Sequence, residues 1–154
     1  MSESGFADMS RERLRELLAG LADVRIAVVG DYFLDRYLFI DRALTEPSIE
    51  TGLDAWQVVG KRPQPGAAGT VTSNLTALEV GEIRAVGLVG DDGEGYEMRQ
   101  GLARTGVDCR HLIISPDIMT PTYCKPMRRE ADGTETEMNR FDSRNREPTS
   151  DELQ

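Results

Sequence analysis

Apolar residues along this chain follow two spacings, one typical of helices and one typical of buried strands. Leucines within residues 10–21 recur at the i, i+3, i+4, i+7 spacing of an amphipathic helix, and Ser10 can cap it. Short runs rich in β-branched residues predict strands at 24–29, 83–89 and 107–115. Polar residues do not alternate with apolar ones in the first run, so we expect both of its faces to be buried, as in a parallel sheet.

Two further helices are predicted between these strands. The run Gly66-Ala67-Ala68-Gly69-Thr70 opens a helical spacing that continues to residue 78, and a second helix over 96–105 ends at Gly106. The order is helix, strand, irregular excursion, helix, strand, helix, strand. Such alternation predicts an α/β fold with parallel strands and right-handed crossovers.

Two segments do not follow this alternation. Residues 37–64 mix turn signals with the apolar piece 55–59, which includes Trp56, and we expect a loop with one or two edge strands there. Residues 122–127 and 135–141 are strand-like around Asp132-Gly133, a hairpin signal. The final residues, 143–154, are polar and linker-like.

Charge and composition narrow the function classes. The 154 residues carry 18 basic and 27 acidic side chains, a net charge of -9, which argues against binding to nucleic acid or to anionic membranes. No apolar run is long enough for a membrane span, and the first residues lack the apolar core of a signal peptide, so we expect a cytoplasmic protein. Cys109 and Cys124 are then expected to be free thiols, and no Cys/His spacing indicates a zinc site.

Carboxylates at the end of a strand are the first candidate for chemistry. In the stretch VVGDYFLD, Asp31 and Asp35 follow the strand that ends at Gly30, and ligands of parallel sheets bind beyond the carboxyl ends of the strands. Carboxylates accept hydrogen bonds from hydroxyl groups, so a sugar or polyol is a natural partner. The alternative is that Asp31 caps a turn and Asp35 is solvated.

Two glycine-containing stretches leave similar alternatives. PGAAGT at 65–70 allows close approach of a ligand to free amides at a helix start, or simply tight packing of helix on sheet. It matches neither phosphate-loop nor dinucleotide-binding spacing. VGDDGEG at 89–95 lacks the spacing of a calcium loop and is interpreted as an acidic turn.

Four segments together resemble one family. They are VVGDYFLDRY at 28–37, PGAAGTVTSNLTAL at 65–78, VGLVGDDGEGYEMRQGLARTGVD at 86–108, and TPTYCKPM followed by MNRFD within 120–142. In order and spacing they resemble the ribokinase-like, or PfkB, carbohydrate kinases, and most closely the bacterial heptose-phosphate kinase branch. The resemblance covers nearly all of the chain after residue 24.

The resemblance implies a fold and an activity. The fold is α/β, the N-terminal part of a ribokinase-like doubly wound sheet with a small β lid. Residues 24–36 and 65–115 would form the core, 37–64 and 120–142 the lid, and 143–154 a linker. The activity is transfer of the γ-phosphoryl group of ATP, with Mg²⁺, to a hydroxyl of a sugar or sugar phosphate. The lid is expected to cover the sugar and to pair two subunits in a homodimer.

The resemblance also assigns substrate-binding residues. Asp35 matches the aspartate that grips the sugar, Asp31 belongs to the same motif, and Lys125 matches a basic position of the lid. Gly66, Ala67 and Thr70 fall in the turn that the family writes Gly-Gly-Ala-Ala-Asn. Thr70 therefore replaces an asparagine that commonly contacts the sugar, and Ala67 replaces a glycine.

One part of the family pattern is missing. The family carries its catalytic base in a Gly-Ala-Gly-Asp motif, which is absent from these 154 residues, so we expect no catalytic residue here. The first hypothesis is a truncated kinase domain over 1–154 that binds sugar but is inactive alone. The second is a non-catalytic sugar-binding or lid-dimerisation module. A generic nucleotide-binding α/β protein is disfavoured because phosphate loops are missing.

Overall fold

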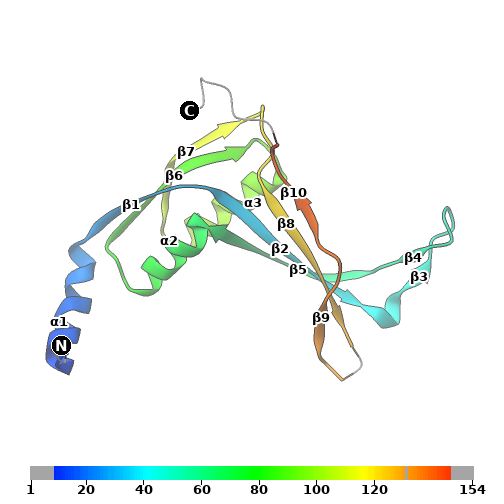
Figure 1. The fold of residues 1–154 in the computed structure, drawn as a ribbon, viewed down its shortest axis with the longest axis horizontal. Coiled ribbons are helices and arrows are strands. Elements are labelled where there is room, and N and C mark those ends of the chain that lie inside the picture. Colours follow the sequence, from blue (N-terminus) through cyan, green and yellow to red (C-terminus); the bar gives the residue numbers. More distant parts are fainter. Residues whose placement is uncertain (1–8, 131, 147–154) are drawn as a thin grey trace, which may run out of the picture.

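A parallel sheet of three strands forms the core of the computed structural model, which describes residues 9–130 and 132–146 (Figure 1). Its strands are β1 (Arg25–Val29), β6 (Glu82–Gly90) and β7 (Asp108–Ser115), in the order β1-β6-β7. Helices α2 (Ala68–Ala77) and α3 (Gly93–Arg104) precede β6 and β7 respectively. The predicted alternation of helices and parallel strands is confirmed.

One face of this core sheet holds the hydrophobic core. Each crossover steps in the same direction along the sheet, and right-handed crossovers of this kind place both helices on one face. Val89 of β6 and Met98 and Leu102 of α3 lie together there, fully or almost fully buried. The side chains that point to the opposite face of β1 are exposed.

The predicted burial of both faces of residues 24–29 is therefore wrong. β1 has the alternating pattern of an edge strand, with Ile26 and Val28 packed against the core and Val29 75% exposed. The run is apolar although only one of its two faces is buried. Val29 lies on the exposed face although it is apolar, so the hydrophobicity of this residue does not reveal its exposure.

A second sheet, here called the lid sheet, extends away from the core. It contains β2 (Tyr32–Asp41), β5 (Val58–Ala67), β8 (Thr122–Arg129), β9 (Glu135–Glu137) and β10 (Phe141–Ser143). The order is β10-β8-β2-β5, with β9 also paired to β8; β2 and β8 are parallel and the other pairs antiparallel. The predicted lid of strands outside the main sheet is confirmed.

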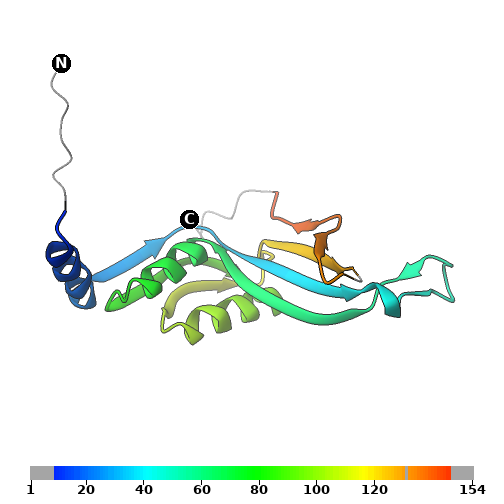
Figure 2. The ribbon, with the colours of Figure 1, turned by 90° about the horizontal axis from the view of Figure 1, so that it is seen from below.

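A small hairpin forms the far end of the lid. β3 (Glu46–Pro47) pairs with β4 (Asp54–Ala55) beyond a 3₁₀ turn at Arg42–Leu44, and Figures 1 and 2 show the pair as a projecting arm. Trp56 and Val58, at the base of this arm, are partly exposed. The hairpin between β8 and β9 turns at Gly133, whose φ of 84° requires glycine-like freedom, which confirms the Asp132-Gly133 signal.

The lid starts earlier in the chain than the sequence suggested. The expected change from core to lid was at residues 36/37 and 64/65, but β2 begins at Tyr32 and β5 ends at Ala67. Figures 1 and 2 show β1 passing almost directly into β2. Asp35 and Gly66 thus lie within lid strands instead of at the mouth of a core strand. β2 escaped notice because both of its faces carry apolar residues, which hides the alternation of a strand.

Three smaller features complete the fold. α1 (Arg11–Gly20) is capped by Ser10 as predicted, and a 3₁₀ turn at Leu21–Asp23 links it to β1. The expected strand over 135–141 is split into β9 and β10. Of the linker-like end 143–154, Ser143 belongs to β10, and residues 147–154 lie outside the described residues.

Two further expectations concern the cysteines and membrane-spanning helices. Cys109 and Cys124 are free thiols, as expected. Within 9–130 and 132–146, no helix combines the length and the hydropathy that a membrane span requires.

Candidate functional site

A cleft of about 410 Å³ lies where the core and lid sheets meet. Its lining comes from the β1–β2 junction, the helix start at Ala67, the end of β6, and the lid, and consists of Asp31, Tyr32, Phe33, Ala67, Leu88, Ile118, Pro121, Tyr123, Arg144 and Asn145. Asp31 follows the carboxyl end of β1, and Leu88 lies near that of β6. This is the position at which parallel sheets bind ligands.

Aromatic rings form the lid side of the cleft. The rings of Phe33 and Tyr123 meet edge to face with centroids 4.7 Å apart. The guanidinium groups of Arg140 and Arg144 lie 4.9 and 5.0 Å from the centre of the Tyr123 ring. Asn145 fixes the rim, because its amide donates to the Met119 carbonyl at 2.7 Å. The cleft thus offers apolar ring surface beside basic groups.

Asp35 and Lys125 form an ion pair on the same face of the lid sheet. Lys125 Nζ lies 2.6 Å from Asp35 Oδ1, and the two side chains are 17% and 18% exposed. The Lys125 ammonium also donates to the Tyr37 hydroxyl at 3.4 Å. Burial alone would lower the pKa of Lys125, but the hydrogen bonds to Asp35 and Tyr37 outweigh it and raise the pKa. Lys125 therefore stays charged.

Register places this ion pair beside the aromatic rings. Asp35 is the direct partner of Tyr123 in the β2–β8 pairing. Residues two apart on a strand share a face, so Asp35 lies on the face that carries Phe33. The structure thus brings Asp35 and Lys125 together next to the cleft, although they are 90 positions apart in the sequence.

Asp31 and Ala67 meet at the wall between core and lid. The Asp31 carbonyl accepts the Ala68 amide at 3.1 Å, which ties the end of β1 to the start of α2. Ala67 caps α2 with φ 46° and ψ -114°, a region that favours glycine. Both residues line the cleft.

Gly66 and Thr70, unlike Asp31 and Ala67, do not line the cleft. A Cβ at residue 66 would collide with the ring of Phe33, so Gly66 lets that ring lie across β5. Thr70 is exposed, and its hydroxyl donates to the Pro65 carbonyl at 3.4 Å. It does not line the cleft, so the structure does not group it with the other candidates.

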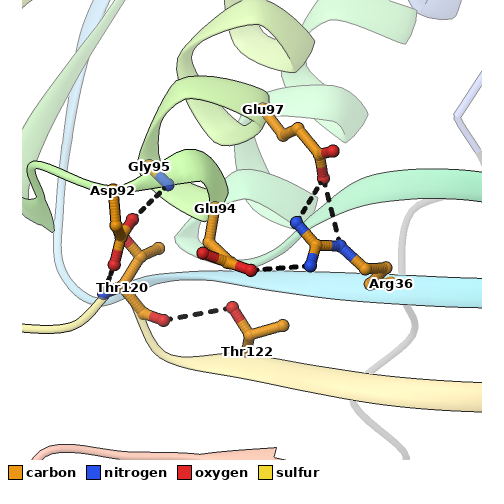
Figure 3. Close-up of polar contacts among 7 residues, drawn as sticks. All are labelled: Arg36, Asp92, Glu94, Gly95, Glu97, Thr120 and Thr122. Carbon is orange, nitrogen blue, oxygen red and sulfur yellow. Dashed lines mark hydrogen bonds and ion pairs between the residues drawn. The ribbon is translucent and has the colours of Figure 1, made fainter.

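A polar network around the start of α3 was missed in the sequence (Figure 3). Arg36 of β2 lies between two acids of α3, with Nη1 2.6 Å from Glu94 Oε1 and Nη2 2.8 Å from Glu97 Oε2. Asp92 accepts hydrogen bonds from the Gly95 amide at 2.7 Å and from the Thr120 amide and hydroxyl at 2.8 and 2.7 Å. The expected helix start at residue 96 is corrected to Gly93, because Asp92 is the cap.

These contacts have electrostatic consequences. Burial would raise the pKa of Asp92, but the hydrogen bonds from Thr120 and Gly95 outweigh it and lower the pKa. Burial would lower the pKa of Arg36, but Glu97 and Glu94 outweigh it and raise the pKa. In the sequence, Asp92 before Gly-Glu-Gly already indicates the N-cap of a helix. Nothing local in the sequence pointed to Arg36 as the partner of α3.

The described residues bring together no set of ligands that would fit a magnesium ion. No group of three His, Cys, Asp or Glu side chains within 9–130 and 132–146 is arranged to hold a metal ion. The start of α3, which could otherwise attract a phosphate, already holds the Asp92 carboxylate.

Solved structures identify the fold. A carbohydrate kinase from Agrobacterium tumefaciens matches with a TM-score of 0.56 and 21% identity over 77% of this chain and 35% of that protein. Arabidopsis thaliana ribokinase complexed with ribose and ATP matches with a TM-score of 0.50 and 19% identity over 74% of this chain and 35% of that protein. The fold is that of ribokinase-like carbohydrate kinases, as predicted.

Sequence relatives agree with this fold. The bifunctional protein HldE of Nitrosococcus oceani is 35% identical over 112 residues, which are 73% of this chain and 23% of that protein. HldE of Trichlorobacter lovleyi is 28% identical over 95% of this chain and 28% of that protein. No family model matches the chain. The chain is thus similar in sequence to HldE proteins and in fold to ribokinase-like carbohydrate kinases, and it spans about a quarter of the length of these HldE relatives.

Proposed function

We propose that this chain forms the sugar-binding part and the lid of a kinase that phosphorylates a hydroxyl of a sugar or sugar phosphate, with ATP and Mg²⁺ as donor and cofactor. The observation that carries the proposal is the cleft at the carboxyl ends of β1 and β6, lined by Asp31 and flanked by the Asp35–Lys125 pair. Similarity to HldE proteins and to carbohydrate kinases of solved structure supports the reaction class.

Asp35 is proposed to grip the sugar. A carboxylate has two oxygens with about four lone-pair sites, and the 2.6 Å contact of Lys125 Nζ with Oδ1 does not occupy all of them. The remaining lone pairs can accept from sugar hydroxyls, while Lys125 keeps the carboxylate oriented. Asp31 can accept from a second hydroxyl at the other wall of the cleft. The rings of Phe33 and Tyr123 supply apolar surface for the C–H side of a sugar.

The proposal is less detailed for the phosphate donor than for the sugar. Arabidopsis ribokinase is described with bound ribose and ATP, and this supports ATP as the donor. We assign sugar binding to residues of this chain and assign phosphate or metal binding to none of its described residues. Gly66 and Ala67 are proposed to shape the cleft, and Thr70 is proposed to contact a ligand only where that ligand extends over the start of α2.

Titration calorimetry with hexoses, heptoses and their phosphates tests the sugar proposal. Asp35→Ala is expected to lower the affinity by about 10–100-fold, because hydrogen bonds to a charged group contribute roughly 1.5–3 kcal/mol. Asp54→Ala removes an exposed carboxylate of the β3–β4 hairpin, outside the cleft, and should leave the affinity unchanged. Equal affinities for the Asp35 variant and the native chain would show that Asp35 does not bind the sugar and serves only the ion pair with Lys125.

A second function is favoured by the surface of the lid. Leu44, Ile49 and Leu53 on the projecting arm are largely or fully exposed, and clustered exposed apolar residues mark contact surfaces. We propose that the lid pairs two copies of the chain. Sedimentation equilibrium should show a dimer for the native chain and a monomer for the double variant Ile49→Asp with Leu53→Asp. The control Tyr96→Asp replaces an exposed aromatic residue of α3 and should remain a dimer. A native monomer at all concentrations tested would refute the pairing.

A further inference from the structure

The first turn of α3 contacts both central strands of the lid. Arg36 belongs to β2 and reaches Glu94 and Glu97 of the helix. Thr120 lies just before β8 and is bound by Asp92, the cap of the same helix. Since β2 and β8 are neighbours in the lid sheet, one helical turn holds two adjacent strands by two separate sets of contacts (Figure 3).

The attachment at β2 is geometrically restrictive. Both Nε and Nη2 of Arg36 donate to Glu97 Oε2, at 3.2 and 2.8 Å, while Nη1 donates to Glu94. Arg36 is only 21% exposed, and a planar guanidinium bound on two edges allows little rotation. Because successive strand residues point to opposite faces, Arg36 faces α3 while its neighbour Asp35 faces Lys125.

The attachment at β8 is buried. Thr120 is 1% exposed, and its hydroxyl also accepts the Gly90 amide at 2.8 Å, which links the end of β6 to the lid. A Cβ at residue 95 would collide with the Gly90 carbonyl and with Thr120 Oγ1, so Gly95 allows this close approach. The Thr122 hydroxyl then donates to the Thr120 carbonyl at 3.0 Å, inside β8.

We propose that this α3 clamp, formed by Arg36, Asp92, Glu94, Glu97 and Thr120, sets the angle of the lid sheet on the core, and that Arg36 is a positioning residue for the cleft. Besides this clamp, the two sheets are joined by short backbone connections at 30–31 and 67–68, by the segment 116–121, and by the packing of Tyr32 and Leu34 against the core cluster. Backbone connections can bend and apolar packing is non-directional, whereas the hydrogen bonds of the clamp fix an orientation. If β2 leaves α3, Phe33 and Asp35 move away from Asp31 and Leu88.

Hydrogen exchange of the 154-residue chain without sugar tests the clamp. In Arg36→Gln, amides of β2 and β8 should exchange about tenfold faster, because local opening follows the contacts that hold a segment. Amides of β6 should change by less than about twofold. Arg36→Lys keeps the charge but loses the planar fork, so its exchange should fall between the native chain and Arg36→Gln.

Matched variants separate the clamp from a general loss of stability. Arg110→Gln breaks the exposed Arg110–Asp108 pair within β7 and should leave β2 and β8 unchanged. Glu94→Gln retains the Arg36–Glu97 contact and should give a smaller, roughly threefold increase in the lid strands, which keeps the test valid if Arg36→Gln fails to fold. Equal acceleration in both sheets, or none in β2 and β8, would overturn the clamp.

The consequence for the cleft rests on the proposed sugar site and has its own readout. Where the native chain binds a sugar, Arg36→Gln should weaken that binding about three- to tenfold although Arg36 does not line the cleft. Unchanged affinity together with faster lid exchange would overturn the positioning role alone. If no sugar binds the native chain, the proposed function fails, while the exchange data still decide the clamp.

Discussion

Ala67 has a backbone conformation that alanine rarely adopts, with φ 46° and ψ -114°. Its side chain is exposed, so replacing it with glycine removes little packing. Strain of this kind costs about 1–3 kcal/mol, and the added freedom of glycine in the unfolded chain offsets about 0.4–1 kcal/mol of the relief. Ala67→Gly should therefore raise the free energy of unfolding by roughly 1 kcal/mol.

Urea unfolding followed by circular dichroism measures this change. The matched control is Ala103→Gly on the exposed side of α3, where φ is ordinary and glycine should destabilise by about 1 kcal/mol. Opposite signs for the two substitutions would identify backbone strain at Ala67. A lower unfolding midpoint for both would mean that Ala67 is not strained in solution.

Individual site residues were predictable to different degrees. Asp31 and Ala67 lie together because both are at the edge of the sheet where strands end and a helix begins. The order of predicted strands and helices in the sequence already implies this position. The pairing of Asp35 with Lys125 depends on the parallel register of β2 and β8, which no local pattern reports. Thr70 was grouped with the site by resemblance, but the first turn of α2 directs it elsewhere.

At the scale of elements, the cap of α3 gives a pH-dependent contribution to stability. Asp92 has a pKa below its ordinary value of 3.8: burial opposes the charged form, but hydrogen bonds from Thr120 and Gly95 prevail. A carboxylate with a lowered folded-state pKa stabilises the fold fully above the unfolded pKa. That contribution is lost as the pH falls through the lower folded value.

Asp92→Asn should lower the free energy of unfolding at pH 7 by roughly 1–2 kcal/mol, the scale of a lost helix cap. The gap between native chain and variant should narrow as the pH is lowered below about 4, where the native carboxylate begins to protonate on unfolding. Urea titrations at pH 7, 5 and 3.5 measure it. Asp54→Asn, at an exposed position of the β3–β4 hairpin outside α3, serves as the comparison. A gap that stays constant across these values would exclude the Asp92 charge as its cause.

The elements followed from local patterns where these are distinct: helical spacing for α2 and α3, and short runs rich in β-branched residues for β6 and β7. β2 has no such distinct pattern, because Leu34 and Ile40 pack on one face while Phe33 and Phe39 lie on the other, and the segment was divided between core and loop. The start of α3 was placed three residues late because glycine at 93 and 95 lowers helix propensity, although the cap favours the helix there.

At the scale of the whole molecule, the two sheets have different roles. The core sheet carries α2 and α3 on one face, and on its other face Val29 and Ile113 are exposed. The lid sheet carries the aromatic and charged groups that flank the cleft. This division explains why fold class was predictable from spacing, whereas the site depends on how one sheet is set against the other.

Phosphoryl transfer requires more groups than the described residues bring together. It needs a positioned hydroxyl, a base near its proton, and donors or metal ions around the charge that develops on the phosphate. The cleft offers Asp31, with Asp35 beside it, on the sugar side. The start of α3 carries the acids Asp92 and Glu94, which repel a phosphate. A carboxylate acting as base alone contributes about 10²–10⁴-fold, far below enzymatic acceleration.

The 154-residue chain is therefore expected to bind sugar without phosphorylating it. The assay follows ATP consumption by the purified chain with hexoses, heptoses and sugar phosphates as acceptors, and Asp35→Ala and Asp54→Ala distinguish catalysis at the cleft from a contaminating kinase. We expect no turnover above background for any of the three proteins. Turnover above about one per minute, well below the usual 1–10³ per second of enzymes, would contradict this expectation if Asp35→Ala abolished it and Asp54→Ala did not. In that case the cleft would hold a complete phosphoryl-transfer site, and Asp35 would act on the reacting hydroxyl itself.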